Sequence, residues 1–414
     1  MEIFRIAALF AAALILCAAL EAGWHAPEGK ALPQLYLQVE RMSPEEQHGV
    51  LSIAGDESPL RNIGVLVRRR GNSSAKSEKW SYHLRFGQPA SLLGMDAGEG
   101  WILLGMPFDK SLIRTTLAFE YARSLGLDDV SQTRFCELHV QGDYRGVYLL
   151  TEPVTPEGLG LDTSDFILER NKDREEAGML AVVTDAGIRF ELDCGRRLTD
   201  GTDELALLNR AERAMVSGDM AQYERYIDVD SFVNTYILQE VIKCVDFAAY
   251  SDRYYVRGGR LYAGPLWDVD LSMGNVTSTW MTEPNYRLYY NAEGDGDGSG
   301  DSVSGLWAQR DWFAFLCRDE AFMQRVRARW REIYPVTENL VSDNHLGQNR
   351  IDATAGICMA AAKDNYDPDS GWSLKRGYPY LEYNGRFRRY DQTLEHLRDW
   401  LARRIDWLNS RFAG

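Results

Sequence analysis

The clearest pattern along the chain is an alternation of apolar and polar residues from Lys79 to Phe86. The aromatic and aliphatic residues fall on one face and the lysine, serine, histidine and arginine on the other, which predicts a β-strand with one buried face. Shorter apolar runs bounded by turn residues predict further strands. They cover residues 35–39, 65–68, 135–140, 145–151 and 166–168, and a hairpin over 254–263.

Helices are predicted where apolar residues recur every three or four positions. This spacing is found over 112–125, 203–216, 230–245 and 394–412. Asp230 is the expected N-cap of the third helix, because its side chain can accept a hydrogen bond from an N–H group of the first turn. Since most predicted strands come early and most helices late, we expect a β-rich part over 24–152 and a mainly helical part over 153–414.

Residues 1–23 have the character of a signal peptide or a short membrane anchor. The apolar run from Ile6 to Leu20 is 15 residues long, which is short for a membrane span and suits the core of an export signal. We therefore expect the rest of the chain to lie outside the cytoplasm, either secreted or anchored at the cell surface.

The overall charge limits the possible partners. The 414 residues carry a net charge of −15, with 45% hydrophobic and 26% charged residues, as in ordinary globular proteins. Such a chain lacks the positive field that binds nucleic acid or an anionic membrane surface, so any membrane association is expected only through the N-terminal segment. The basic run Arg68–Arg70 is interpreted as a solvated face.

Two carboxylates stand inside an apolar segment that follows the predicted hairpin. Asp268 and Asp270 flank Val269. In a strand both acids point to the same side, where they repel one another unless a divalent cation lies beside them. Oxygen ligands alone favour Mg²⁺ or Mn²⁺ over Zn²⁺. The alternative is a capped turn without a metal.

A third acid, Asp246, follows the predicted helix over 230–245. An acid at that end opposes the helix dipole, so a purely structural role is unfavourable. Ser251 comes five residues later, the separation at which protein kinases place a catalytic aspartate and a metal-binding asparagine. The order of Asp246, hairpin and Asp268 therefore predicts a catalytic base and a metal ligand in one kinase-like site.

The first half of the chain contains a turn and a lysine that suit a phosphate. The turn Gly71–Ser74 joins two predicted strands, and its small residues let backbone N–H groups approach phosphate oxygens. Lys79 begins the next strand on its polar face, from which it could bridge phosphates. Taken singly, the turn is an ordinary β-turn and the lysine a solvated side chain. Glu152 ends a strand, either at a hinge between the two parts or as an exposed terminus.

Several other reaction classes lack their residues in this sequence. Neither a Gly-x-Ser-x-Gly elbow nor a His-Glu-x-x-His pair is present, so hydrolase triads and zinc peptidase sites are not indicated. The six cysteines include no Cys-x-x-Cys pair, which argues against a disulfide framework or a zinc site.

Taken together, these segments resemble the spore coat protein H (CotH) family of atypical protein kinases. The resemblance covers about residues 64–275, with its pieces in family order. The pieces are Arg70-Gly71-Asn72-Ser73-Ser74, Lys79-x-Ser81-Tyr82-x-Leu84-x-Phe86, Asp109-Lys110-Ser111-Leu112-Ile113-Arg114, Gly142-x-Tyr144-x-Gly146 through Glu152, and Trp267-Asp268-x-Asp270-x-x-x-Gly274.

The resemblance implies a role for each candidate residue. Asn72, Ser73 and Ser74 would cover the phosphates of ATP, Lys79 would contact them, and Glu152 would lie near the adenine. Asp246 would accept the proton of the substrate hydroxyl. Asp268 would bind Mg²⁺ or Mn²⁺, with Asp270 as a second ligand. Glu120 or Arg114 would orient Lys79. The chain departs from kinases where Lys243-Cys244-Val245 precede Asp246 and where Ser251 or Asp252 would replace the metal-binding asparagine.

The resemblance also implies a fold class and a function. The fold is expected to be α+β, a reduced protein-kinase-like fold of two lobes with a β-rich N-lobe and a mainly helical C-lobe. The expected activity is transfer of the ATP γ-phosphate to Ser or Thr of secreted or surface proteins. The alternatives are a non-catalytic coat or surface scaffold of the same fold, and an ATP-dependent transferase that acts on something other than protein.

Overall fold

The structure is a computed structural model, and it describes residues 31–275, 303–366, 387 and 389–414. Within those ranges it leaves out residues 42, 72–73, 75–76, 78, 128, 173–178 and 196–199. The predicted leader, residues 1–23, lies outside the described residues. No helix in the described ranges has both the length and the apolar character that crossing a membrane requires.

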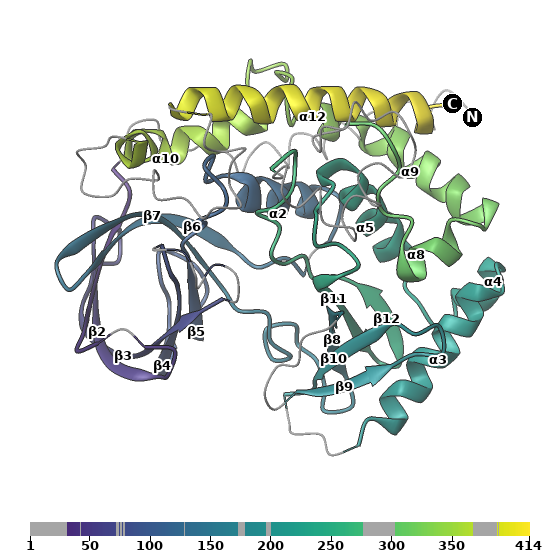
Figure 1. The fold of residues 1–414 in the computed structure, drawn as a ribbon, viewed down its shortest axis with the longest axis horizontal. Helices are drawn as coiled ribbons and strands as arrows, with labels where there is room; N and C mark the ends of the chain where they lie inside the picture. The colour runs from purple at the N-terminus through teal and green to yellow at the C-terminus, as the bar shows by residue number, and fades with distance from the viewer. Residues whose placement is uncertain are drawn as a thin grey trace, which may run out of the picture.

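Seven strands close into a barrel, which lies at the left of Figure 1. They are β1 (Gln34–Val39), β2 (Gln47–Ala54), β3 (Leu60–Arg70), β4 (Ser81–Ala90), β5 (Gly98–Leu104), β6 (Thr133–Val140) and β7 (Asp143–Thr151). The order around the barrel is β1-β2-β3-β4-β5-β7-β6, and the parallel pair of β6 with β1 closes it. The alternation predicted around β4 is confirmed from Tyr82 to Phe86, because Tyr82, Leu84 and Phe86 are all buried in the barrel core, but Lys79 and Ser81, which were expected on the polar face, are buried as well.

A second, antiparallel sheet of five strands follows the barrel in the sequence. Its strands are β8 (Phe166–Asn171), β9 (Leu180–Val183), β10 (Arg189–Asp193), β11 (Tyr250–Arg257) and β12 (Arg260–Ala263). Their order is β12-β11-β8-β10-β9, so the predicted hairpin forms one edge of the sheet. The sheet lies to the lower right of the barrel in Figure 1.

Eight helices are described. They are α2 (Arg114–Ser124), α3 (Thr202–Val216), α4 (Met220–Tyr223), α5 (Val229–Ile242), α8 (Asp311–Leu316), α9 (Glu320–Glu338), α10 (Arg350–Tyr366) and α12 (Tyr390–Phe412). Every residue of α5 from Phe232 to Ile242 is buried, as expected for a helix at the centre of a core. The N-cap of α5 is Asp228, which accepts a hydrogen bond from Ser231, so the prediction of Asp230 is wrong.

Figure 1 shows how the helices connect the two sheets. Helices α10 and α12 run along the top of the molecule, and α2 and α5 lie beneath them. One large hydrophobic core joins α2 and α5 to the second sheet and to the C-terminal helices. The barrel interior forms a separate core.

The predicted fold class is wrong. Its N-terminal part is a closed barrel and not an open kinase N-lobe sheet, and the remainder contains a five-stranded sheet beside its helices. The chain is therefore not a two-lobed kinase-like fold with a mainly helical C-lobe. Two features explain the error. The barrel closes by pairing residues about a hundred positions apart, which no local pattern indicates. Short, half-buried strands such as β9 show no regular alternation of apolar and polar residues.

Candidate active site

The candidate site forms where α5 ends. The helix stops at Lys243, which adopts the left-handed conformation, and the chain then turns through residues 245–249. The N–H of Val245 donates to the carbonyl of Leu271 at 2.9 Å, and the N–H of Met273 donates to Ile242 at 2.6 Å. The segment that carries Asp246 is therefore held alongside the segment that follows the hairpin.

The carboxylates of these two segments influence one another. Burial raises the pKa of Asp270 well above its usual value, and the negative charges of Asp268, Asp109 and Asp246 raise it further. Asp268 itself is exposed, and its Oδ2 accepts a hydrogen bond from the Ser251 hydroxyl at 3.1 Å. The structure therefore brings Asp246, Ser251, Asp268 and Asp270 into one acidic region.

Asp252 adds a fourth carboxylate to this region. Its Oδ2 accepts a hydrogen bond from the N–H of Ala248, inside the turn that carries Asp246. Burial raises the pKa of Asp252 well above its usual value, and the charges of Asp311 and Asp246 add to the rise. Asp252 is thus an internal brace of this turn.

A magnesium ion fits this set of donors in one particular way. No group of three or more Asp, Glu, His or Cys side chains in the described residues is arranged to hold a metal by itself. Asp268 and Asp270 supply carboxylate oxygens whose mutual repulsion a divalent cation would relieve. Mg²⁺ is commonly bound by one or two carboxylates together with phosphate oxygens and waters. The residues therefore suit a metal that arrives with a nucleotide.

The backbone around these acids is strained. Lys243, Ala248, Ser251, Asp268 and Met273 all have positive φ values, between 48° and 62°, although none is a glycine. Each such residue costs of the order of 1–3 kcal/mol and persists only where its surroundings enforce it. Strain of this kind is typical of segments that hold functional side chains in place.

An internal ion pair supports the second acidic segment. Arg114 of α2 pairs with Asp109 at 2.6 Å, and both side chains are 1% exposed. The Arg114 guanidinium also donates to the carbonyl oxygens of Ser272 and Met273 at 3.0 and 3.4 Å. The segment Asp109–Arg114 that the resemblance singled out thus braces the backbone that carries Asp268 and Asp270.

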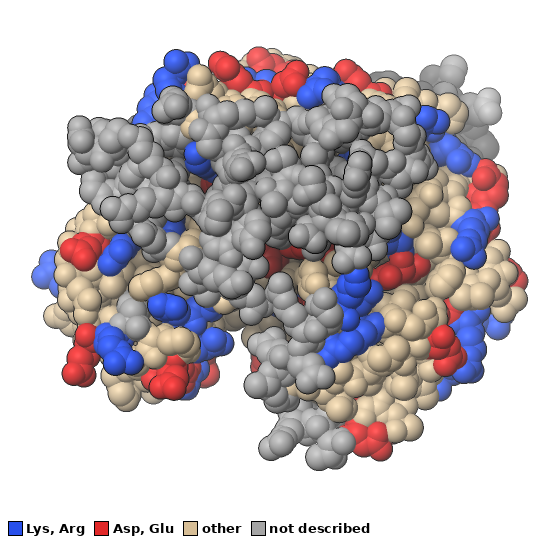
Figure 2. Space-filling view, in the orientation of Figure 1, with Lys and Arg blue, Asp and Glu red and all other residues tan. Residues whose placement is uncertain are grey.

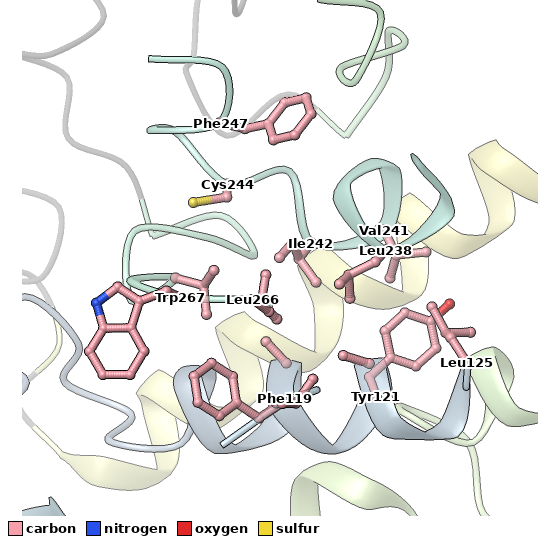
Figure 3. Packing of buried hydrophobic residues seen from close by; sticks show 14 of the residues in the cluster. Phe119, Tyr121, Leu125, Leu238, Val241, Ile242, Cys244, Phe247, Leu266 and Trp267 are labelled. Atoms are coloured by element: carbon pink, nitrogen blue, oxygen red, sulfur yellow. The ribbon is translucent and has the colours of Figure 1, made fainter. Parts of the chain in front are cut away.

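Trp267 and Gly274 hold the two ends of the same segment in place. Its ring lies 6.5 Å from that of Phe119 on α2, and Figure 3 shows both in one apolar layer with Leu266 and Ile242. Gly274, at the far end, has a φ of +75°, and a Cβ built there would lie 2.6 Å from Cγ of Trp400 on α12. The motif from Trp267 to Gly274 is therefore fixed between α2 and α12.

Lys79 lies inside the protein. It is 2% exposed and precedes β4, and its amine donates to the carbonyl of Val147 at 2.6 Å and lies 5.2 Å from the ring of Tyr148. Neither residue expected to orient Lys79 makes a described contact with it. Arg114 holds the acidic segment, while Glu120 accepts a hydrogen bond from Thr354 of α10 at 3.5 Å.

The burial of Lys79 predicts a pH dependence of stability. Burial lowers the pKa of its amine to about 7, whereas an exposed lysine has a pKa of about 10.4. Between these values the unfolded chain binds the extra proton, so the free energy of unfolding rises with pH, by up to about 1.4 kcal/mol per unit. Lys79→Met should flatten this rise in urea unfolding between pH 7 and 10. The exposed Lys172→Met is the control, and a profile for Lys79→Met parallel to that of the wild type would contradict the assignment.

The other residues predicted to contact the nucleotide are either not described or make hydrogen bonds within the protein. Asn72 and Ser73 lie outside the described residues. Ser74 is partly buried, and its carbonyl accepts hydrogen bonds from the N–H and the hydroxyl of Ser77 at 3.1 and 2.8 Å. Glu152 follows β7, and its Oε2 accepts a hydrogen bond from the N–H of Gln132 at 2.9 Å.

Two arginines near the acids were not expected from the sequence. The guanidinium of Arg70, the last residue of β3, lies 5.5 Å from the centre of the Trp267 ring, and that of Arg253 lies 4.9 Å from it. Arg70 was interpreted as part of a solvated run. The signal that could have found it is its position directly before the turn at Gly71.

The space-filling view shows the surface between the barrel and the second sheet. Figure 2 shows a hollow between the barrel and the five-stranded sheet, with Lys and Arg side chains on the barrel surface beside it. The Arg70–Trp267 contact joins these two parts of the protein, because Arg70 belongs to the barrel and Trp267 follows the second sheet. The end of β3 and the segment that carries Asp268 and Asp270 therefore lie side by side.

Comparison with known proteins gives one result that bears on this site. The family model described as CotH kinase protein matches residues 67–408, which is most of the chain. No curated protein matches the chain. The matched range includes the turn after β3, Asp246 and the Trp267–Gly274 segment. The resemblance found in the sequence is thereby confirmed, and the chain belongs to the CotH kinase protein family.

Proposed function

We propose that this protein is a CotH-like kinase that transfers the γ-phosphate of ATP to serine or threonine of secreted or surface proteins. The observation that carries the proposal is the meeting of Asp246 with Asp268 and Asp270 at the end of α5, close to the end of β3. Membership of the CotH kinase family supports the same reaction.

The residues of the chain divide the work of in-line phosphoryl transfer. Asp246 accepts the proton of the attacking hydroxyl, since a partly buried carboxylate beside the metal site can serve as the base. Asp268 and Asp270 hold Mg²⁺ or Mn²⁺, and Ser251 keeps the Asp268 carboxylate in position through its hydrogen bond. When bound, the metal ion neutralises charge on the phosphates. The turn at residues 71–74 covers the phosphates, and Glu152 lies near the adenine.

The location and substrate are part of the proposal. The apolar run from Ile6 to Leu20 supports export or anchoring, so the substrates would be proteins of the same compartment. The net charge of −15 favours a protein and a metal-bound nucleotide over nucleic acid as partners.

Nucleotide binding and phosphotransfer can be tested on the purified protein. We expect saturating Mg²⁺·ATP to raise the melting temperature, because a ligand at a hundred times its Kd stabilises the folded state by about 2.7 kcal/mol. ATP with EDTA, and Mg²⁺ alone, are the controls. We also expect label from γ-³²P-ATP to appear on serine or threonine of the protein itself or of casein.

The outcomes separate the alternatives. Absence of any shift with Mg²⁺·ATP would contradict the kinase proposal and favour a binding scaffold. A shift with ATP turnover but no labelled protein would indicate a transferase with a different acceptor.

A further inference from the structure

Two guanidinium groups lie over the ring of Trp267, next to the exposed carboxylate of Asp268. Arg70 comes from the barrel and Arg253 from β11, at 5.5 and 4.9 Å from the ring centre. The two cations are close enough to repel one another electrostatically. Burial lowers the pKa of Arg70, the charge of Asp268 opposes this, and the charge of Arg253 lowers it further.

The positive charge of this pair is not fully satisfied. Arg253 pairs with Glu169 at 3.0 Å, and its side chain is only 13% exposed. Its Nη1 atom is buried and has no hydrogen-bond partner among the described residues. The side chain of Arg70 makes no hydrogen bond or ion pair with any described residue, although its backbone pairs with Ser81 of β4. Buried N–H groups of arginine seldom remain without an acceptor, and a phosphate could supply one here. The Nε of Arg69 also lacks a described acceptor, but Arg69 lies over Trp80, so the position of the Arg70–Arg253 pair beside Asp268 is what distinguishes it.

The lysine expected to bind phosphate is not available at this position. The amine of Lys79 is bonded to Val147 inside the barrel, and burial lowers its pKa to about 7, so only part of it carries a charge at neutral pH. A guanidinium stays charged and offers a planar pair of donors that matches two phosphate oxygens.

We propose that Arg70 and Arg253 bind the terminal phosphates of the nucleotide, which would lie between these guanidinium groups and a metal ion on Asp268. This inference rests on the proposed kinase function and names the cations of its phosphate subsite. A phosphate there would satisfy the free N–H of Arg253 and reduce the repulsion between the two arginines. Trp267 would act as the platform that holds both guanidinium groups in place.

The test compares nucleotides of different phosphate number. Arg70→Gln should weaken Mg²⁺·ATP binding about 10- to 100-fold, as for a lost charged hydrogen bond, while AMP binding changes by less than about twofold. Calorimetric titration with each nucleotide measures both. Arg253→Lys keeps a cation for Glu169 but loses the planar pair of donors, and it should show the same selective loss. The matched control is Arg69→Gln, because the Arg69 guanidinium lies over Trp80, 4.0 Å from its ring centre.

Each outcome decides the inference. Unchanged Mg²⁺·ATP affinity in Arg70→Gln, or an equal loss for ATP and AMP, would overturn it while leaving the kinase proposal intact. If Lys79→Met weakened Mg²⁺·ATP binding and Arg70→Gln did not, the phosphate contact would belong to Lys79 and the inference would be wrong. Failure of the wild-type protein to bind any nucleotide would instead remove the proposed function, and the inference with it.

Discussion

We expect Asp246→Asn to slow phosphotransfer by about a thousandfold and to leave Mg²⁺·ATP affinity within about twofold of wild type. A positioned general base contributes about 10²- to 10⁴-fold to a rate, and asparagine has nearly the same shape but cannot accept the proton. The turn itself should survive, because the Asp246 backbone carbonyl, and not its side chain, accepts the N–H groups of Ala249 and Tyr250 at 2.9 Å each. Initial rates with labelled ATP and a separate binding titration measure the two quantities.

The control for this experiment is Asp230→Asn. Asp230 lies in the first turn of α5, and its side chain is 74% exposed and pairs with Arg325 at the surface. It should leave rate and affinity unchanged. A normal rate in Asp246→Asn would refute its role as the base. An equal loss of rate and of nucleotide affinity would show that Asp246 contributes to binding and not to the chemical step.

The second large effect is expected on stability. Arg404 of α12 pairs with Glu240 of α5 at 2.7 Å, and both side chains are 0% exposed. Glu240 also accepts hydrogen bonds from the N–H groups of Trp307 and Ala308. Arg404→Leu leaves this carboxylate buried without its cation. Removing one partner of a buried pair costs about 3–5 kcal/mol, so the free energy of unfolding in urea should fall by that amount.

The neighbouring residue provides a matched control on the same helix. Arg403 is half-exposed and pairs with Asp399 one turn earlier, so Arg403→Leu should change the free energy of unfolding by at most about 0.5 kcal/mol. The double variant Glu240→Gln, Arg404→Leu should recover part of the loss, because it removes the unpaired charge. An unfolding midpoint for Arg404→Leu equal to that of wild type would show that the carboxylate finds another partner.

The sequence predicted local elements well where one face of the element is buried. The alternation before Phe86 and the spacing of apolar residues in α2, α3 and α12 correspond to observed elements within a few residues. The period fails at the ends of elements. The alternation includes Lys79, but β4 starts at Ser81. The pattern therefore predicted a solvated lysine on the polar face of the strand, whereas Lys79 is buried.

The overall architecture could not be predicted from local patterns. Closure of the barrel depends on β1 pairing in parallel with β6, and no local signal in either strand specifies a partner so distant in the sequence. The middle of β10 is buried on both faces, with the pattern intermediate, three buried, intermediate, and so shows no alternation. Both features were missed, and both changed the fold class.

The candidate site was partly accessible from the sequence. The order of Asp246, hairpin and Asp268 pointed to two segments that lie side by side, because an antiparallel hairpin returns the chain to its starting point, while the roles of these residues stay a prediction. The contribution of Arg70 could not be deduced, since its position over Trp267 depends on how the barrel packs against the second sheet. Arg114 and Glu120, the two candidates to orient Lys79, contact Asp109 and Thr354 instead.

Helix α12 supports the acidic region through three separate contacts. The hydroxyl of Tyr390 donates to the carbonyl of Ser111, Trp400 packs against Gly274, and Arg404 neutralises Glu240. Each contact supports a different piece of chain around the acids, yet all three come from one helix that lies far from them in the sequence. Loss of α12 would therefore take support from all three pieces while leaving the separate core of the barrel in place.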